Sequence, residues 1–433
     1  MPKVFYRISN IICLVLKGVP IGTNKGLFHL IFAIISGRFL TARGGVFPAL
    51  LDMGLDQQEI QRAGDALSDG VWNIATLVDN WQKIVQQEEL VQLPSYEGYV
   101  PRPCDLTAFY RPRLQGLGSK HYHSQSKKAI PAVVFGLSVS VVYVGKQRLG
   151  IPTLILRGKN NESDAKLQSR LVRTIAPTLK KNDVAVFDAG FLLSDMLKYS
   201  INYVLRAAKN ATARRNYLPE AKGKGRRSEY GEVIRPTPRT HKEKIIPATP
   251  PDKTETWIEG KHIIRAEIWE NLVPANQKPG GTPFRMVAIH HPSYKEPLIL
   301  ETNLPISAKA LLQIYYSRWP VELVPQTAKP ILGTHHSSVH GKESRYRLPE
   351  LALLSGSVLS YVAATEAPVA TGFWDRVAQG TCGRLSRSLS QVNFSKLPLS
   401  LGEVREKRSR TDQLPKGAEA RRLHKSAQVA QSS

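Results

Sequence analysis

Cysteine is scarce in this chain, which has only Cys13, Cys104 and Cys382 among its 433 residues. None of them belongs to a C-x-x-C pair, and three thiols cannot build a disulfide framework. The sequence therefore excludes a zinc finger and a small disulfide-rich secreted scaffold. It favours a reducing, cytoplasmic location.

Long apolar runs are also missing near the start. The most apolar stretches there are residues 11–16 and 26–40, and Lys17 ends the first while Arg38 interrupts the second. A helix that crosses a bilayer needs about 20 consecutive apolar residues. No small-x-small cleavage site follows residues 1–17, as a signal peptide would require. We predict packed helices here and no membrane partner.

Negative charge is the third shortage. The chain has 35 Asp and Glu against 60 Lys and Arg, so its formal net charge is +25. Such an excess indicates a polyanionic partner, and without an anchor nucleic acid is favoured over a membrane surface. No P-loop and no G-x-S-x-G motif occurs, so nothing supports ATP-driven or serine-hydrolase chemistry.

The order of patterns along the chain predicts a mixed α/β protein. Apolar residues recur at three- and four-residue steps through the first ninety-odd positions, which is typical of helices. Residues 129–157 are rich in Val, Ile and Leu around GKQRLG and predict a β-hairpin. An amphipathic helix is expected within 160–181, a buried strand at 183–187, and further strands at 262–305.

A strongly basic segment lies between the last two of these regions. Residues 206–244 hold twelve Lys or Arg and four Glu, a local balance of 12 − 4 = +8, and five prolines between 236 and 251 predict no regular element in its second half. Such a run is either a solvated linker or a loop that contacts DNA phosphates. We favour phosphate contacts. The arginines assigned to them are Arg206, Arg214, Arg215, Arg226 and Arg227.

A helix predicted after Ser307 carries four functional residue types at helical spacing. Steps of three, four and seven residues place them within an arc of about 60°. These residues are Tyr315, Arg318, Glu322 and Lys329. An exposed stripe with an Arg318–Glu322 ion pair would explain the same pattern.

Two more carboxylates stand in strand contexts. Asp105 lies in PCDLTAFYRP, and Asp188 ends the apolar run VAVFD. Because an acid near a buried strand needs a partner, and carboxylate oxygens are ligands for hard divalent ions, these acids could form a metal site with Glu322. Glu301 and Glu343 are alternative third acids, but they lack the face with Tyr, Arg and Lys.

These motifs resemble a known family. The spacing Y-x-x-R-x-x-x-E-x-x-x-x-x-x-K is similar to the Tyr-Arg-Glu-Lys signature of a group of bacterial insertion-sequence DDE transposases. Asp105 with Thr107 resembles the D-x-T motif of that group, and residues 188–191 resemble its D-x-G-F motif. The resemblance covers roughly residues 25–365.

The resemblance implies an RNase H-like fold, a mixed sheet with flanking helices and a β-rich insertion before the helix with the catalytic Glu. It implies an N-terminal helical, DNA-binding domain at 1–95 and a catalytic domain at 96–365 with its insertion at about 206–305. A basic, flexible tail would follow at 366–433. Asp105, Asp188 and Glu322 would be the catalytic metal ligands for two Mg²⁺ or Mn²⁺ ions. Tyr315, Arg318 and Lys329 would hold the DNA.

The implied activity is DNA transposition. The enzyme would cleave strands at the element ends and join the freed 3′-hydroxyl to target DNA. Its partners would be the double-stranded inverted repeats and the target, bound by a homodimer in the bacterial cytoplasm at the nucleoid. Pro320 and Pro325 fall inside the expected Glu helix and predict a kink, which leaves open an inactive relative that only binds DNA.

Overall fold

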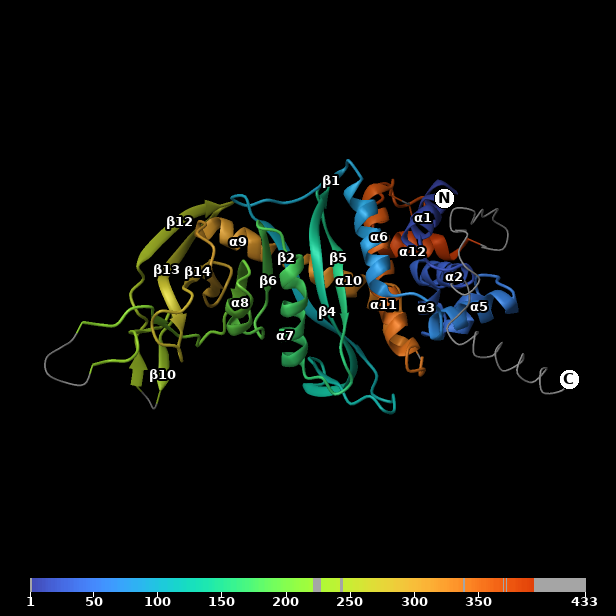
Figure 1. Ribbon diagram of the computed structural model, residues 1–433. Helices are drawn as coiled ribbons and strands as arrows, with labels where there is room; N and C mark the ends of the chain where they lie inside the picture. Colours follow the sequence, from blue (N-terminus) through green and yellow to red (C-terminus); the bar gives the residue numbers. More distant parts are fainter. Residues whose placement is uncertain are drawn as a thin grey trace, which may run out of the picture. The chain divides into compact units, whose positions relative to one another are not determined.

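A computed structural model describes residues 2–220, 227–241, 244–337, 339–368, 370 and 372–392 (Figure 1). It divides into two compact units. The first unit contains Met1–Gln92, Leu106–Ser163 and the chain from Pro320 onward, and the second contains Leu93–Asp105 and Asp164–Trp319. The chain therefore passes from one unit to the other at four points, after residues 92, 105, 163 and 319.

The first unit is rich in helices. Its N-terminal helices are α1 Pro2–Val15, α2 Thr23–Ile35, α3 Arg38–Thr41, α4 Val46–Leu51, α5 Gln57–Ser68 and α6 Ile74–Gln86. Its later helices are α10 Pro320–Gln326, the π-helix η2 Thr327–Ile331, the 3₁₀ turn η3 Thr334–His336, α11 Ser344–Thr365 and α12 Cys382–Ser390. The helical character predicted for the first ninety residues is confirmed.

Strands of the first unit centre on one long hairpin. They are β1 Val91–Gln92, β3 Lys120–His123, β4 Lys128–Val144 and β5 Gln147–Arg157. Strands β4 and β5 pair antiparallel from Val144↔Gln147 to Phe135↔Arg157, so the predicted hairpin is confirmed. Strands β1 and β3 also pair with β4.

Helix α11 forms the middle of the core in this unit. Among the residues that the structure describes, it alone is long and apolar enough to cross a membrane, but 83% of its apolar window is buried inside the protein. The Trp81 indole of α6 donates a hydrogen bond to Ser357 of α11 at 3.1 Å. Helices α1, α2, α5 and α6 share one hydrophobic core with α11 and the hairpin, so α11 is a core helix of a globular unit.

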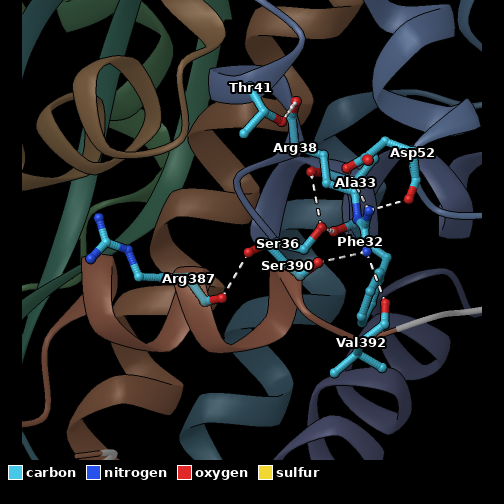
Figure 2. Close-up of polar contacts among 9 residues, drawn as sticks. All are labelled: Phe32, Ala33, Ser36, Arg38, Thr41, Asp52, Arg387, Ser390 and Val392. Atoms are coloured by element: carbon cyan, nitrogen blue, oxygen red, sulfur yellow. Dashed lines mark hydrogen bonds and ion pairs between the residues drawn. The ribbon is translucent and has the colours of Figure 1, made fainter. Parts of the chain in front are cut away.

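A buried arginine joins the two ends of the first unit. Arg38 of α3 is 3% exposed, and its guanidinium donates to the Asp52 carboxylate at 2.6 Å (Figure 2). The other terminal nitrogen donates to the carbonyls of Ser390 and Val392 at 3.0 and 2.8 Å. A cation at the last carbonyls of a helix satisfies acceptors that lack intrahelical partners. Arg38 therefore fixes α12 onto the N-terminal helices.

The second unit is built on a mixed sheet. Its strands are the first half of β2 Val100–Tyr110, then β6 Asp183–Phe187, β7 Tyr203–Arg206, β8 Ala213–Arg215, β9 Val233–Ile234, β12 Lys253–Glu259, β13 His262–Pro274, β14 Phe284–His290 and β15 Leu298–Thr302. The order is β2-β6-β7-β15-β14-β13-β8-β9, with β12 beside β13. Strands β2, β6 and β7 are parallel and the remaining pairs are antiparallel. The predicted mixed α/β class is confirmed.

Helices α7 Asp164–Ile175, α8 Leu193–Tyr199 and α9 Ala308–Tyr316 and the 3₁₀ turn η1 Ala176–Thr178 complete this unit. Residues 194–207, whose periodicity does not separate helix from strand, form both, because α8 ends at Tyr199, Ser200 follows in a left-handed conformation, and β7 begins at Tyr203. The prediction of no regular element among the later prolines is wrong. Strand β10 Arg239–His241 pairs there with β11 Lys244–Ile246, between the prolines at 238 and 247.

Candidate active site

Two acids end up side by side because they follow paired strands. Strands β2 and β6 run parallel, and their register ends at the pair Cys104↔Phe187. Asp105 is the next residue of β2, and Asp188 comes directly after the last residue of β6. Their side chains are 31% and 29% exposed, so both carboxylates remain accessible to solvent.

One guanidinium faces both carboxylates. Arg318 Nη1 lies 3.5 Å from Asp105 Oδ2, and its Nη2 lies 3.6 Å from Asp188 Oδ2. The Arg318 side chain is only 11% exposed, so water screens this attraction poorly. Arg318 sits in the turn after α9, whose C-cap is Ser317. This arrangement compensates the repulsion between two neighbouring acids.

Tyr315 and Arg206 complete the surroundings of Asp188. The Tyr315 hydroxyl donates to Asp188 Oδ1 at 3.2 Å, and Arg206 Nη1 donates to the same oxygen at 3.3 Å. Burial, followed by the Asp188 charge, raises the pKa of the Tyr315 hydroxyl. Burial alone would lower the pKa of Arg206, but Tyr315 and Asp188 outweigh it, so the pKa of this guanidinium is raised. Tyr315 therefore stays a hydrogen-bond donor and Arg206 stays charged at neutral pH.

The first unit holds the other two signature residues. Lys329 lies in η2, and its ammonium donates to Thr107 Oγ1 at 2.6 Å and stands 5.1 Å from the centre of the Phe109 ring. Thr107 is 5% exposed. Glu322 lies in the first turn of α10 and is half-buried. Lys329 thus binds the threonine of the D-x-T motif.

The prediction of one continuous helix with four residues on one face is wrong. Helix α9 ends at Tyr316, a turn covers 317–319, and α10 begins at Pro320. A proline at the first position of a helix loses no hydrogen bond, since that N–H has no intrahelical acceptor. Pro320 therefore starts a new helix instead of kinking an old one, and the helical-wheel argument does not hold across the break.

The basic segment is placed only in part. Arg226 lies outside the described residues, and Arg227 is exposed. Arg214 donates to the carbonyls of Ala275 and Gly231 at 2.7 and 2.9 Å.

Arg215 requires a correction. It is 8% exposed, and both terminal nitrogens donate to the Asp252 carboxylate at 2.6 Å. Its hydrogen bonds to Asp252 are the main reason that the pKa of Arg215 is raised. A guanidinium that is buried and paired in this way has no free side for a phosphate, so Arg215 is a structural residue of the insertion.

A cavity of about 570 Å³ lies beside Arg206 and Tyr315 in the second unit. Its lining includes Lys209, which belongs to the basic segment 206–244, and Tyr294 and Lys295, which no motif marks. The signal for Tyr294 and Lys295 is the run of basic and aromatic residues at 290–295. The cavity adds cationic and aromatic groups next to Asp188.

Glu301 and Glu343, the alternative third acids, do not lie among the contacts of Asp105 and Asp188 described above. Glu301 of β15 is 8% exposed, and burial raises its pKa to about 7. Glu343 accepts a hydrogen bond from Arg157 at 2.9 Å, while that arginine also binds Glu350 of α11. Glu343 thus belongs to an ion-pair network that supports α11.

Asp105 and Asp188 provide part of what a hard divalent cation needs as a binding site. Asp105 and Asp188 supply accessible carboxylate oxygens that already face a positive charge, which is the donor type that Mg²⁺ and Mn²⁺ prefer. Within the described parts of the chain, no group of three or more His, Cys, Asp or Glu side chains is arranged to hold a metal. The second unit contributes two acids, and the predicted third, Glu322, belongs to the first unit.

Comparison with known proteins identifies a family. The model for a transposase DDE domain matches residues 107–353, which is more than half of the 433-residue chain. The match includes Asp188 and Glu322 and begins two residues after Asp105. No curated protein matches the chain.

Proposed function

The chain belongs to the transposase DDE domain family, and from this premise we propose that it cuts DNA at the ends of an insertion sequence and joins them to target DNA. A transposase acts on DNA, in agreement with the net charge of +25. The mixed α/β architecture fits an RNase H-like transposase fold. Membership of the Tyr-Arg-Glu-Lys group is part of the proposal and rests on the spacing of Tyr315, Arg318, Glu322 and Lys329.

The observation that carries the proposal is the pair of acids on parallel strands that share one guanidinium. In the proposed reaction, Asp105, Asp188 and Glu322 would hold divalent cations, which supply activation of the attacking hydroxyl and stabilisation of the leaving oxygen. Arg318 keeps the two aspartates together, and Tyr315 fixes the orientation of Asp188 through its hydroxyl.

The cations of the chain have a separate part in the proposal. Arg206 is 47% exposed, and its guanidinium can fork onto a phosphate beside Asp188. Lys329 contributes a point charge next to the D-x-T motif. Arg227 extends the phosphate contacts into the insertion. A homodimer on two element ends, located in the bacterial cytoplasm, completes the proposal.

Glu322→Gln tests the catalytic assignment. The change keeps size and polarity but removes the charge that would hold a cation. Nicking of labelled DNA with the inverted repeats of the element, in Mg²⁺ or Mn²⁺, should fall by orders of magnitude. Binding measured on the same DNA should persist, because affinity depends on Lys and Arg.

Glu343→Gln is the matched control, since it removes a carboxylate of the same unit that is 50% exposed and pairs with Arg157. It should keep nearly full nicking. Nicking by Glu322→Gln at the wild-type rate would exclude Glu322 as the third acid. If the wild-type chain binds the ends but never nicks them, the inactive DNA-binding alternative replaces the proposal. The retention of all three acids and of Arg318 argues against that alternative.

A further inference from the structure

Two side chains from η3 hold the end of the π-helix η2. Carbonyl groups at the end of a helix have no donor within the helix. The chain turns back after η2 at Gly333, where φ is 73°. Thr334 Oγ1 then donates to the Ala328 carbonyl at 2.6 Å, and His335 Nδ1 donates to the Lys329 carbonyl at 2.6 Å. The backbone of Lys329 is therefore held from outside its own helix.

His335 is itself fixed by a buried arginine. Arg111 follows β2 directly, is 8% exposed, and donates through Nη1 to the His335 carbonyl at 2.9 Å. Its other terminal nitrogen donates to the Ser337 hydroxyl. Burial lowers the pKa of Arg111 to about 10, so the guanidinium stays charged at neutral pH. Because a buried charge is costly without hydrogen bonds, these contacts tie η3 to the end of β2.

The hydrogen bond to Lys329 also fixes the protonation of the imidazole. A carbonyl oxygen only accepts, so Nδ1 of His335 carries the proton. Burial is the main cause that lowers the pKa of His335, and the nearby cationic side chains act in the same direction. The hydrogen bond to the Lys329 carbonyl opposes this shift without reversing it, so the ring is neutral at neutral pH. His335 therefore brings a directed donor to Lys329 and no charge.

The side chain of Lys329 ends on β2. Its ammonium donates to Thr107 Oγ1 at 2.6 Å and stands 5.1 Å from the centre of the Phe109 ring. Thr107 and Phe109 are two residues apart on the strand and share one of its faces. A lysine carries its charge on a flexible stem of four carbons, so the ammonium keeps this place best while its backbone is held.

We propose that His335 is a positioning residue, which holds the backbone of Lys329 so that the ammonium meets a DNA phosphate beside the D-x-T motif. This inference rests on the proposed function, in which Lys329 is a point charge for DNA. A displacement of about 1 Å in a positioned group can cost about 100-fold in rate. Loss of the His335 donor should therefore slow cleavage far more than it weakens DNA binding.

The reactivity of the Lys329 amine tests the positioning without DNA. An amine that donates to Thr107 should be methylated slowly by formaldehyde and a borohydride. His335→Ala should raise the methylation rate of Lys329 severalfold relative to that of Lys146, an exposed lysine of the same unit, as measured by mass spectrometry. His335→Asn keeps an N–H donor near the Nδ1 position and should return the rate toward that of the wild type. An equal relative rate in the wild type and His335→Ala would overturn the proposal.

Cleavage kinetics measure what the positioning contributes. At saturating DNA with Mg²⁺, His335→Ala should nick the element ends about 10- to 100-fold more slowly. The salt slope of its DNA affinity should equal that of the wild type, because a neutral ring adds no phosphate contact. His335→Asn should recover most of the rate. His340→Ala, which removes an exposed histidine of the same unit, should keep the wild-type rate.

The outcomes separate this inference from the proposed function. A wild-type chain that never nicks DNA refutes the proposed function, while the methylation of Lys329 still decides on His335. Wild-type nicking by His335→Ala, or a folded His335→Asn that rescues neither measurement, would refute the positioning role. A reduced salt slope in His335→Ala would also count against it, since the ring would then contact a phosphate itself.

Discussion

Arg318 supplies the positive charge that compensates Asp105 and Asp188, a role that a bound cation could also fill. Its guanidinium lies 3.5 and 3.6 Å from their oxygens and is largely buried. Removing a cation that compensates two neighbouring carboxylates leaves them repelling each other. A divalent ion that binds both would then stabilise the folded chain more than it does in the wild type.

The first prediction follows from this competition. Arg318→Ala should lower the melting temperature, and millimolar Mn²⁺ should raise it by more than in the wild type. The measurement is thermal unfolding with and without the metal, independent of DNA. Arg113→Ala, which removes an exposed arginine of the first unit, should respond to Mn²⁺ as the wild type does. An equal response from Arg318→Ala would argue against a metal site at these acids.

Glu301 gives the second prediction at the residue scale. Burial raises its pKa from 4.5 to about 7, so the folded chain keeps this proton between those pH values while the unfolded chain has released it. Stability should therefore fall as pH rises through this range, by up to about 3 kcal/mol. Glu301→Gln cannot titrate, and its unfolding free energy in denaturant should depend less on pH between 4.5 and 7. An unchanged pH slope would contradict the assignment.

At the scale of elements, the position of α10 depends on one glycine. A Cβ on Gly150 of β5 would lie 2.5 Å from the Pro320 carbonyl oxygen, which is closer than real Cβ atoms approach backbone. Glu322 follows two residues after Pro320. The close approach of strand and helix therefore requires the absence of a side chain.

The third prediction is that Gly150→Ala displaces α10. It should cost about 1–3 kcal/mol of stability by overpacking and should reduce nicking more than DNA binding. Gly383→Ala is the control, because a Cβ there meets nothing within 4 Å and α12 should gain up to about 1 kcal/mol. Chemical denaturation and the nicking assay together separate the two variants. Normal nicking by Gly150→Ala would show that α10 tolerates the displacement.

Elements with strong local patterns could be predicted from sequence. The hairpin β4–β5 follows from two β-branched runs around a glycine turn, and β6 follows from VAVF before Asp188. The pairing of β2 with β6 could not be predicted, because it joins residues about 80 positions apart that no local pattern connects. The identity of Asp105 and Asp188 as a pair came from motifs, whereas their common contact with Arg318 depends on the turn after α9.

Pro320 and Arg215 depart from the predictions for different reasons. Proline is as typical of a helix start as of a kink, and the C-cap at Ser317 decides between the two for Pro320. Charge density alone predicts a phosphate contact for Arg215. Its burial depends on Asp252, which lies 37 residues away, just before β12.

At the scale of the whole molecule, the excess of positive charge should make the affinity for DNA fall as the salt concentration rises. The fourth prediction contrasts two arginines of the basic segment. Arg227→Ala should reduce the slope of log affinity against log salt by about 0.9, because one exposed phosphate contact is lost, without a change in stability. Affinity for a duplex at several salt concentrations provides the slope.

Arg215→Ala should behave in the opposite way. It leaves the Asp252 carboxylate without its bidentate partner and should cost about 1–3 kcal/mol of stability. The salt slope of the folded variant should stay at the wild-type value. A reduced slope for Arg215→Ala would restore this residue to the phosphate-binding set.

The four passages of the chain between the units bear on what a truncated copy of the gene could produce. The core of the first unit needs α11, which ends at residue 365, as well as the helices before residue 87. The sheet of the second unit needs the short segment before Asp105 together with strands that begin at residue 183. A chain stopped by a frameshift before residue 298 would lack both β15 and α11, so both cores would be incomplete and exposed to proteases. Such a short product should therefore not persist as a stable fragment that competes with the full-length protein for DNA.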